Sequence, residues 1–140
     1  MSAPFRLVGL DHVVLRAREP KRLLAFYRDV LGCTLEREQP AFGLTQLRAG
    51  RSLIDLVDVA GPVGRAGGAA AGSEGRNMDH LCLRIDPFDA GAIAAHLRRH
   101  GVEPGETGSR YGAEGEGPSI YLADPEGNVV ELKGPPAQAA

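Results

Sequence analysis

The segment LDHVVLR at residues 10–16 returns as MDHLCLR at residues 78–84, so that Asp, His, Leu and Arg recur at an offset of 68 positions. A second pair of segments, LIDL at 53–56 and VVEL at 129–132, recurs at an offset of 76. Each half of the chain therefore begins with a copy of the first segment and ends with a copy of the second. Self-similarity of this kind predicts two copies of one structural module, the second longer by the eight residues that separate the two offsets.

Each module reads as a strand, a helix and three further strands. Pro20 and Pro87 each suit the first turn of a helix, and Gly32 and Gly101 each suit its end. Both predicted helices carry apolar residues at helical spacing between these limits. The strands expected after the helices lie at 34–38, 44–49 and 52–59 in the first module, and at 102–103, 119–123 and 128–133 in the second.

Turn and loop residues mark the boundaries of the modules. The sequence DPEGN at 124–128 is typical of a tight turn between adjacent antiparallel strands. The Gly-rich stretch 105–118 is expected to hold the surplus residues as a loop, which could close over a site as a lid. The predicted organisation is one domain over residues 1–140, with a first module at about 7–59, a linker at 60–77 and a second module at about 78–134.

Composition excludes several classes of partner. The net charge of −2 gives no attraction to nucleic acid or to an anionic membrane, and no apolar run reaches the length of a membrane span. The chain has no Trp, and its two cysteines form no CxxC pair. No secretion signal is recognisable at the N-terminus. We therefore expect a cytoplasmic protein that binds neither nucleic acid nor membranes.

Four residues with metal-binding side chains occupy matching strand positions. Because side chains alternate along a strand, the apolar neighbours of His12, Asp55, His80 and Glu131 can pack under a helix while these four lie on the reverse face. A lone histidine would mean little, but here Asp, His, Leu and Arg return together. The pattern predicts that two imidazoles and two carboxylates converge on one cation.

The ligand types suit a divalent transition metal. Imidazole and carboxylate bind Zn, Ni, Fe, Mn or Co, and two carboxylates offset the charge of the ion. Four protein ligands around a six-coordinate ion leave two positions for water or substrate, as in a catalytic site. Asp55 is one methylene shorter than Glu, so Gln46 and Asp58 are substitutes considered for its place.

Nearly the whole chain, from about residue 7 to 134, resembles the vicinal oxygen chelate superfamily of glyoxalases, bleomycin-resistance proteins and extradiol dioxygenases. The segments that carry the resemblance are LDHVVLR at 10–16, FYRDVLG at 26–32, MDHL at 78–81 and DPEGNVVEL at 124–132. The resemblance implies an α+β fold of two tandem βαβββ modules that form a cupped, eight-stranded mixed sheet. It also implies that His12, Asp55, His80 and Glu131 hold the metal. Asp55 departs from glyoxalase I-like members, which carry Glu there.

The first functional hypothesis is a metal-dependent enzyme with glyoxalase-like lyase or isomerase chemistry on a small oxygenated substrate. Bidentate chelation of two substrate oxygens would stabilise an enolate or oxyanion. Glu131 or Asp55 could act as the base. Residues that could contact the substrate are Arg16, Arg84, Arg110, Tyr111 and Tyr121.

Two other functions remain open from the sequence. One is a non-catalytic protein that sequesters a small molecule or drug, as bleomycin-resistance proteins do, although this chain keeps a plausible set of metal ligands. The other is an extradiol-type dioxygenase, for which His12, His80 and Glu131 could hold Fe(II). Open sheet edges favour a homodimer in either case, with the site completed within one chain or across two.

Overall fold

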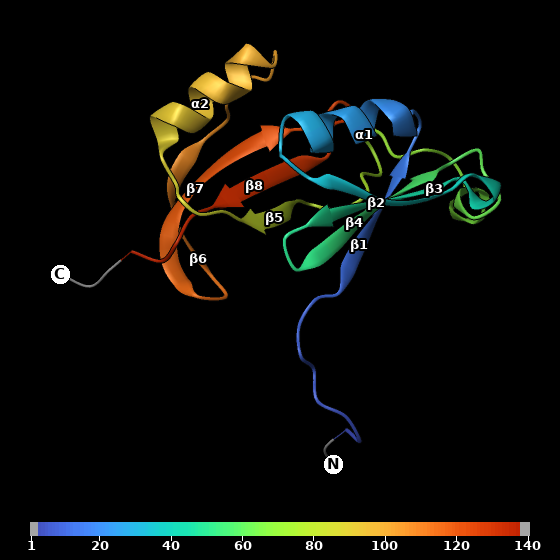
Figure 1. The fold of residues 1–140 in the computed structure, drawn as a ribbon, viewed down its shortest axis with the longest axis horizontal. Coiled ribbons are helices and arrows are strands. Elements are labelled where there is room, and N and C mark those ends of the chain that lie inside the picture. The colour runs from blue at the N-terminus through green and yellow to red at the C-terminus, as the bar shows by residue number, and fades with distance from the viewer. Residues whose placement is uncertain (1–2, 138–140) are drawn as a thin grey trace. The chain divides into compact units, whose positions relative to one another are not determined.

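Eight strands form two four-stranded sheets of the same topology in the computed structural model, which describes residues 3–137 (Figure 1). The first sheet has the order β1 (His12–Ala17), β4 (Ser52–Asp58), β3 (Leu44–Ala49) and β2 (Thr34–Gln39). The second has the order β5 (Leu81–Arg84), β8 (Val129–Lys133), β7 (Gly115–Ala123) and β6 (Thr107–Gly112). β1 runs parallel to β4, and β5 runs parallel to β8. The other neighbouring strands are antiparallel. The predicted α+β class with two βαβββ modules is confirmed.

The first sheet packs its apolar face under α1 (Pro20–Asp29), which contacts β3 and β4. Pro20 lies at the first helical position as predicted, where its missing N–H is not needed. Leu23 and Tyr27 of the helix are completely buried. Along β1 the alternation holds, since Leu15 is 1% exposed and Val14 is 46% exposed. Each large apolar side chain buried in this way stabilises the module by about 1.5–3 kcal/mol.

The second sheet has a helix of its own, α2 (Ala90–Arg99), which begins three residues after the predicted start at Pro87. The reason is the capping residue Asp89, whose side chain accepts a hydrogen bond of 3.0 Å from the backbone N–H of Ala92. Leu97 is the fully buried residue of this helix. The buried apolar residues of the second sheet are Ile120, Leu122, Val130 and Leu132.

The Gly-rich stretch 105–118 differs from its prediction. Instead of a loop or lid, it contributes β6 and the first part of β7, which pair in antiparallel register from Thr107 opposite Ile120 to Gly112 opposite Gly115. The strand expected at 102–103 is absent from the described residues, and its place in the sheet is taken by β6. Gly108, Gly112 and Gly117 lie within these strands, where they leave room for the long side chains of Arg110 and Lys133.

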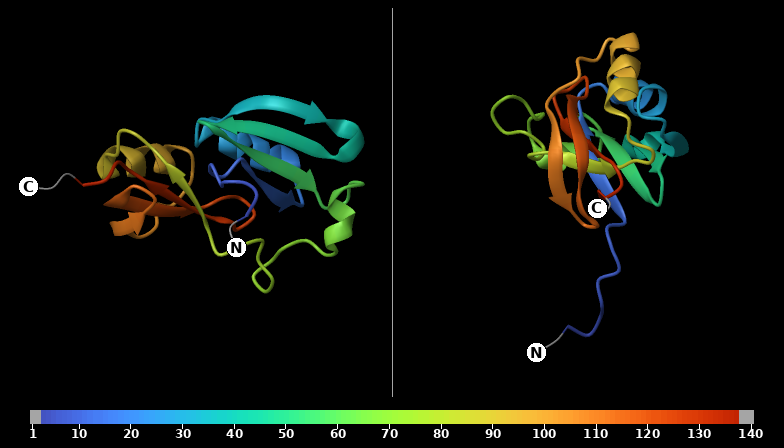
Figure 2. Two further views of the ribbon diagram at one scale, coloured as in Figure 1. Left: turned by 90° about the horizontal axis from the view of Figure 1, so that it is seen from below. Right: turned by 90° about the vertical axis from the view of Figure 1, so that its left-hand side faces the viewer.

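The segment between the modules, 60–77, is a loop that contains one short 3₁₀ helix, η2 (Gly64–Gly67), visible in green in the left view of Figure 2. A second 3₁₀ helix, η1 (Pro40–Phe42), joins β2 to β3. By residue contacts, the chain divides after Ala70 into two compact units, each with one sheet. Within residues 3–137, neither α-helix has the length and apolar character that a bilayer crossing requires.

Candidate functional site

The first sheet brings His12 and Asp55 to neighbouring strands. Asp55 of β4 pairs in register with Val14 of β1, and His12 lies two residues earlier on the same face of β1. Nδ1 of His12 lies 2.7 Å from Oδ2 of Asp11, the residue before it. A histidine whose Nδ1–H is held by a carboxylate presents its Nε2 lone pair to a cation. The hydrogen bond to Asp11 raises the pKa of His12, and the charge of Asp55 adds to this effect.

Asp55 is buried, at 4% exposure, and its two oxygens have different surroundings. Oδ2 accepts a hydrogen bond of 3.2 Å from Nε2 of Gln46, its register partner on β3. Oδ1 is shielded from solvent and has no hydrogen-bond partner among residues 3–137. A buried carboxylate oxygen without a donor is costly unless a ligand compensates it. The surroundings of Asp55 therefore fit a metal ligand, with Gln46 as an orienting neighbour.

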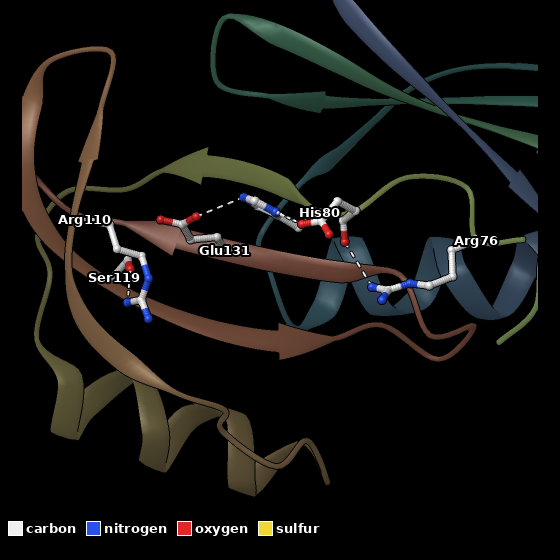
Figure 3. Close-up of polar contacts among 6 residues, drawn as sticks. Arg76, His80, Arg110, Ser119 and Glu131 are labelled. Atoms are coloured by element: carbon white, nitrogen blue, oxygen red, sulfur yellow. Dashed lines mark hydrogen bonds and ion pairs between the residues drawn. The ribbon is translucent and has the colours of Figure 1, made fainter. Parts of the chain in front are cut away.

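The second sheet builds a matching pair from His80 and Glu131 (Figure 3). Nδ1 of His80 lies 2.6 Å from Oδ2 of Asp79, and Nε2 lies 3.2 Å from Oε1 of Glu131. Glu131 is 5% exposed. Two ligands bound at right angles to one transition metal, with bonds of about 2.1 Å, lie about 3 Å apart. The spacing of Nε2 and Oε1 fits that arrangement.

Two neighbours flank Glu131 in the sheet. Cys82 of β5 and Tyr121 of β7 are its register partners on either side. Burial raises the pKa of Tyr121, and a hydrogen bond to Glu131 raises it further, so the phenol stays protonated at neutral pH. Burial and the negative charge of Glu131 raise the pKa of Cys82 to about 11, so this thiol is neutral as well. The ring of Tyr121 also meets the imidazole of His80 edge-on, with 5.6 Å between ring centroids.

The predicted turn at 124–128 delivers β8, and with it Glu131, to this place. The buried carboxylate of Asp124 accepts hydrogen bonds from the backbone N–H groups of Glu126 and Asn128 and from the side-chain amide of Asn128. Gly127 adopts the positive φ of 82° that such a turn needs. Asn128 in turn accepts a hydrogen bond of 3.0 Å from Asn77, which leads into the segment of His80. These hydrogen bonds thus fix the turn that precedes the strand of Glu131.

The three candidate substrate arginines have different surroundings. Arg16 donates hydrogen bonds to the backbone carbonyls of residues 64, 68 and 69, so that its guanidinium holds the segment after β4. Arg84 pairs with Glu114 at 2.9 Å. Arg110 lies over the ring of Tyr121, 4.7 Å from the centroid, and also donates hydrogen bonds to Glu106, just before β6, and to Ser119 of β7. Arg84 thus lines the same cavity as His80 and Glu131, and Arg110 lies over Tyr121, the neighbour of Glu131, whereas Arg16 is engaged in the loop.

A cavity of about 290 Å³ opens beside His80 and Glu131 in the second unit. Tyr111, another candidate substrate residue, lies at its rim and is 80% exposed. The residues that line this cavity are His80, Cys82, Arg84, Tyr111, Gly112, Ala113, Glu114, Glu131 and Lys133. Its volume lies at the lower end of the range for small-molecule sites.

The structure assembles the four predicted ligands as two pairs, which we call the first half-site (His12 and Asp55) and the second half-site (His80 and Glu131). Within either unit, over residues 3–137, three or more His, Cys, Asp or Glu side chains do not gather in a metal-binding arrangement. Asp11 and Asp79 were not among the predicted site residues, although both recur before a histidine in the sequence. Lys133 beside Glu131 was also missed, because its burial has no sequence signal.

This pair of βαβββ sheets, with a histidine and a buried carboxylate in each, defines a protein of the glyoxalase-like fold class. The chain belongs to the Glyoxalase/Bleomycin resistance protein/Dioxygenase superfamily, whose family model matches residues 9–132. The resemblance inferred from the repeated motifs is thereby confirmed.

The chain is similar in sequence to a curated protein and in fold to solved structures. The chain is 25% identical over 138 residues to the mitochondrial methylmalonyl-CoA epimerase of Mus musculus, covering 94% of this chain and 76% of the relative. An integron cassette protein from the mobile metagenome of V. cholerae is 26% identical, with a TM-score of 0.75 over 93% of this chain and 97% of that one. A virulence protein from Salmonella typhimurium shares the fold at 23% identity, with a TM-score of 0.77 over 94% and 99% of the two chains.

Proposed function

We propose that this protein is a metal-dependent enzyme that acts on a small oxygenated substrate. The observation that carries the proposal is the repeated arrangement of the two half-sites. In both, an aspartate holds Nδ1 of the following histidine, and a buried carboxylate lies on the neighbouring strand. Carboxylate–histidine pairs of this kind orient metal-binding imidazoles in many proteins. Membership of the superfamily alone selects no reaction, because its members differ in chemistry.

The number of ligands argues for one shared cation. Each half-site offers one imidazole and one carboxylate, whereas transition metals take four to six ligands. We therefore propose that His12, Asp55, His80 and Glu131 bind a single divalent ion, whether the two half-sites come from one chain or from two. When bound, such an ion supplies Lewis-acid polarisation to two adjacent oxygens of the substrate.

The side chains suit the movement of a proton next to an oxygenated carbon. Oδ1 of Asp55, which has no donor within residues 3–137, and the carboxylate of Glu131 are the proposed proton acceptors. The protonated phenol of Tyr121 can donate a hydrogen bond to a substrate oxygen that gains negative charge. These roles correspond to isomerase or lyase chemistry, and the likeness to an epimerase supports that class.

A homodimer belongs to the proposal. The segment before β1 exposes four large apolar side chains to solvent, which a second copy could cover. These residues, with their exposed fractions, are Phe5 at 68%, Leu7 at 86%, Val8 at 95% and Leu10 at 91%. Light scattering that shows only a monomer at micromolar concentration would remove this part of the proposal.

Metal analysis of protein purified without chelators tests the proposed function. We expect about one divalent ion per chain in the wild type and a loss of most of it in His80→Ala. The matched control is His100→Ala, which removes a histidine that caps the end of α2 and belongs to neither half-site. Equal metal content in all three proteins would contradict the proposal, and metal-free wild-type protein would favour the non-catalytic binding function instead.

A further inference from the structure

Lys133, at the end of β8, is a buried ammonium group without a carboxylate partner. The residue is 6% exposed, and its Nζ donates one hydrogen bond, of 3.0 Å, to the carbonyl of Gly115. No acidic side chain of residues 3–137 lies within ion-pair distance of it, whereas Arg84 and Arg110 nearby pair with Glu114 and Glu106. A largely buried charge with one neutral acceptor is costly, and a bound anion would compensate that cost.

The sheet is built to admit this side chain. A Cβ atom added at Gly112 would lie 2.8 Å from Cε of Lys133, and one added at Gly117 would lie 3.0 Å from Nζ. The two glycines of β6 and β7 thus form a slot for the lysine stem. The chain has 14 arginines and two lysines, the other being the exposed Lys21. A compact ammonium on a thin stem suits a narrow slot better than a planar guanidinium does.

The position of Lys133 directs its charge to the second half-site. It lies two residues after Glu131 on the same face of β8, and its register partner on β5 is Arg84. Lys133, Arg84, Glu131 and His80 all line the cavity of about 290 Å³. The corresponding position of the first sheet, paired in the same register, holds the uncharged Val57. The ammonium is therefore a feature of the second module alone.

We infer that Lys133 binds a carboxylate group of the substrate in this cavity, with Arg84 as a second positive charge at its edge. The inference deepens and rests on the proposed function, because it places the carboxylate beside the oxygens that the metal would hold. The substrate class is then a small carboxylic acid with further oxygen functions. Two N–H groups of the ammonium remain to donate to such an anion, beyond the one given to Gly115.

Calorimetric titration of the metal-free protein with malonate tests the inference without any contribution from the metal. We expect malonate to bind the wild type and to bind Lys133→Met about 10- to 100-fold more weakly, as for the loss of a charge-assisted hydrogen bond. The matched control, Lys21→Met, should bind like the wild type. Malonamide, the uncharged analogue, should bind none of the three. Tighter binding of inorganic phosphate than of malonate would overturn the carboxylate class.

Lys133→Gln separates anion binding from a structural role, because its amide can still donate to the carbonyl of Gly115 without a charge. Thermal unfolding should show both Lys133 variants folded, and Lys133→Gln should also lose malonate binding. Wild-type affinity in Lys133→Gln would overturn the inference. If the wild type lacks metal but its malonate affinity depends on Lys133, only the metal-dependent function fails. If metal is present and the Lys133 variants bind malonate as tightly as the wild type does, only this inference fails.

Discussion

At the scale of single residues, the candidate metal ligands could be singled out because the sequence states them twice. His12 and His80 recur with the same neighbours, and Asp55 and Glu131 recur in the same apolar context. Their burial and hydrogen bonds were not predictable. Nothing in the sequence reveals that Oδ1 of Asp55 lacks a donor, because that depends on which side chain the neighbouring strand places opposite it.

The reactivity of Cys82 was not predictable from the sequence either. A free thiol close to a histidine suggests a reactive thiolate, but the surroundings of Cys82 disfavour that form. Both cysteines are free, Cys33 buried and Cys82 exposed. Although Cys82 is exposed as a residue, partial burial of its thiol group, followed by the charge of Glu131, raises the pKa of Cys82 to about 11. A raised pKa favours the neutral thiol at every lower pH. The thiolate, which is the reactive form, is therefore scarce at neutral pH.

We predict that iodoacetamide alkylates Cys82 of the metal-free protein at pH 7.5 about 100-fold more slowly than a thiol of pKa 9. The rate should rise about tenfold per pH unit up to pH 11, as followed by peptide mass spectrometry. Glu131→Gln removes a negative charge, so it should lower the pKa and accelerate the reaction of Cys82 but not of Cys33. A rate that levels off near pH 9 would show that the thiol is unperturbed.

At the scale of secondary structure, prediction succeeded where local signals and packing agree. The first helix begins at Pro20 as expected, and the predicted strand at 44–49 matches β3. The prediction was wrong where glycine signals a loop but packing requires a small residue in a strand. Gly108, Gly112 and Gly117 lie within β6 and β7, where a Cβ would approach Arg110 or Lys133 too closely. Those contacts exist only after the sheet has formed.

The turn before β8 gives a prediction about stability. Asp124→Ala removes three hydrogen bonds from a buried carboxylate and leaves Asn128 without its acceptor. We expect the free energy of unfolding of the second unit to fall by about 2–3 kcal/mol. Denaturant titration followed by circular dichroism measures this change.

Asp89→Ala is the matched control, since it removes one exposed capping hydrogen bond from the same unit. Its expected cost is about 1 kcal/mol. Equal losses for the two variants would mean that the turn does not support β8 more than an ordinary cap supports its helix. A larger loss for Asp124→Ala should be accompanied by weaker metal binding, because Glu131 lies in the strand that this turn positions.

At the scale of the whole molecule, the repeat explains why two sheets of one topology occur in 140 residues. The surroundings of the two half-sites nevertheless differ. The first half-site has a carboxylate with an unpartnered oxygen, whereas the second has a cavity lined by two cationic side chains. We interpret this difference to mean that both modules bind the metal and that the second module also binds the substrate.

That interpretation makes a quantitative prediction about metal binding. If one ion is shared, equilibrium dialysis should give one ion per chain, and either His12→Ala or His80→Ala should weaken binding strongly. The double variant should then lose much less than the sum of the two single losses, because the first substitution has already broken the shared site. Two independent half-sites would instead bind two ions, and each single variant would keep one of them. The stoichiometry therefore decides whether duplication produced one metal centre or two.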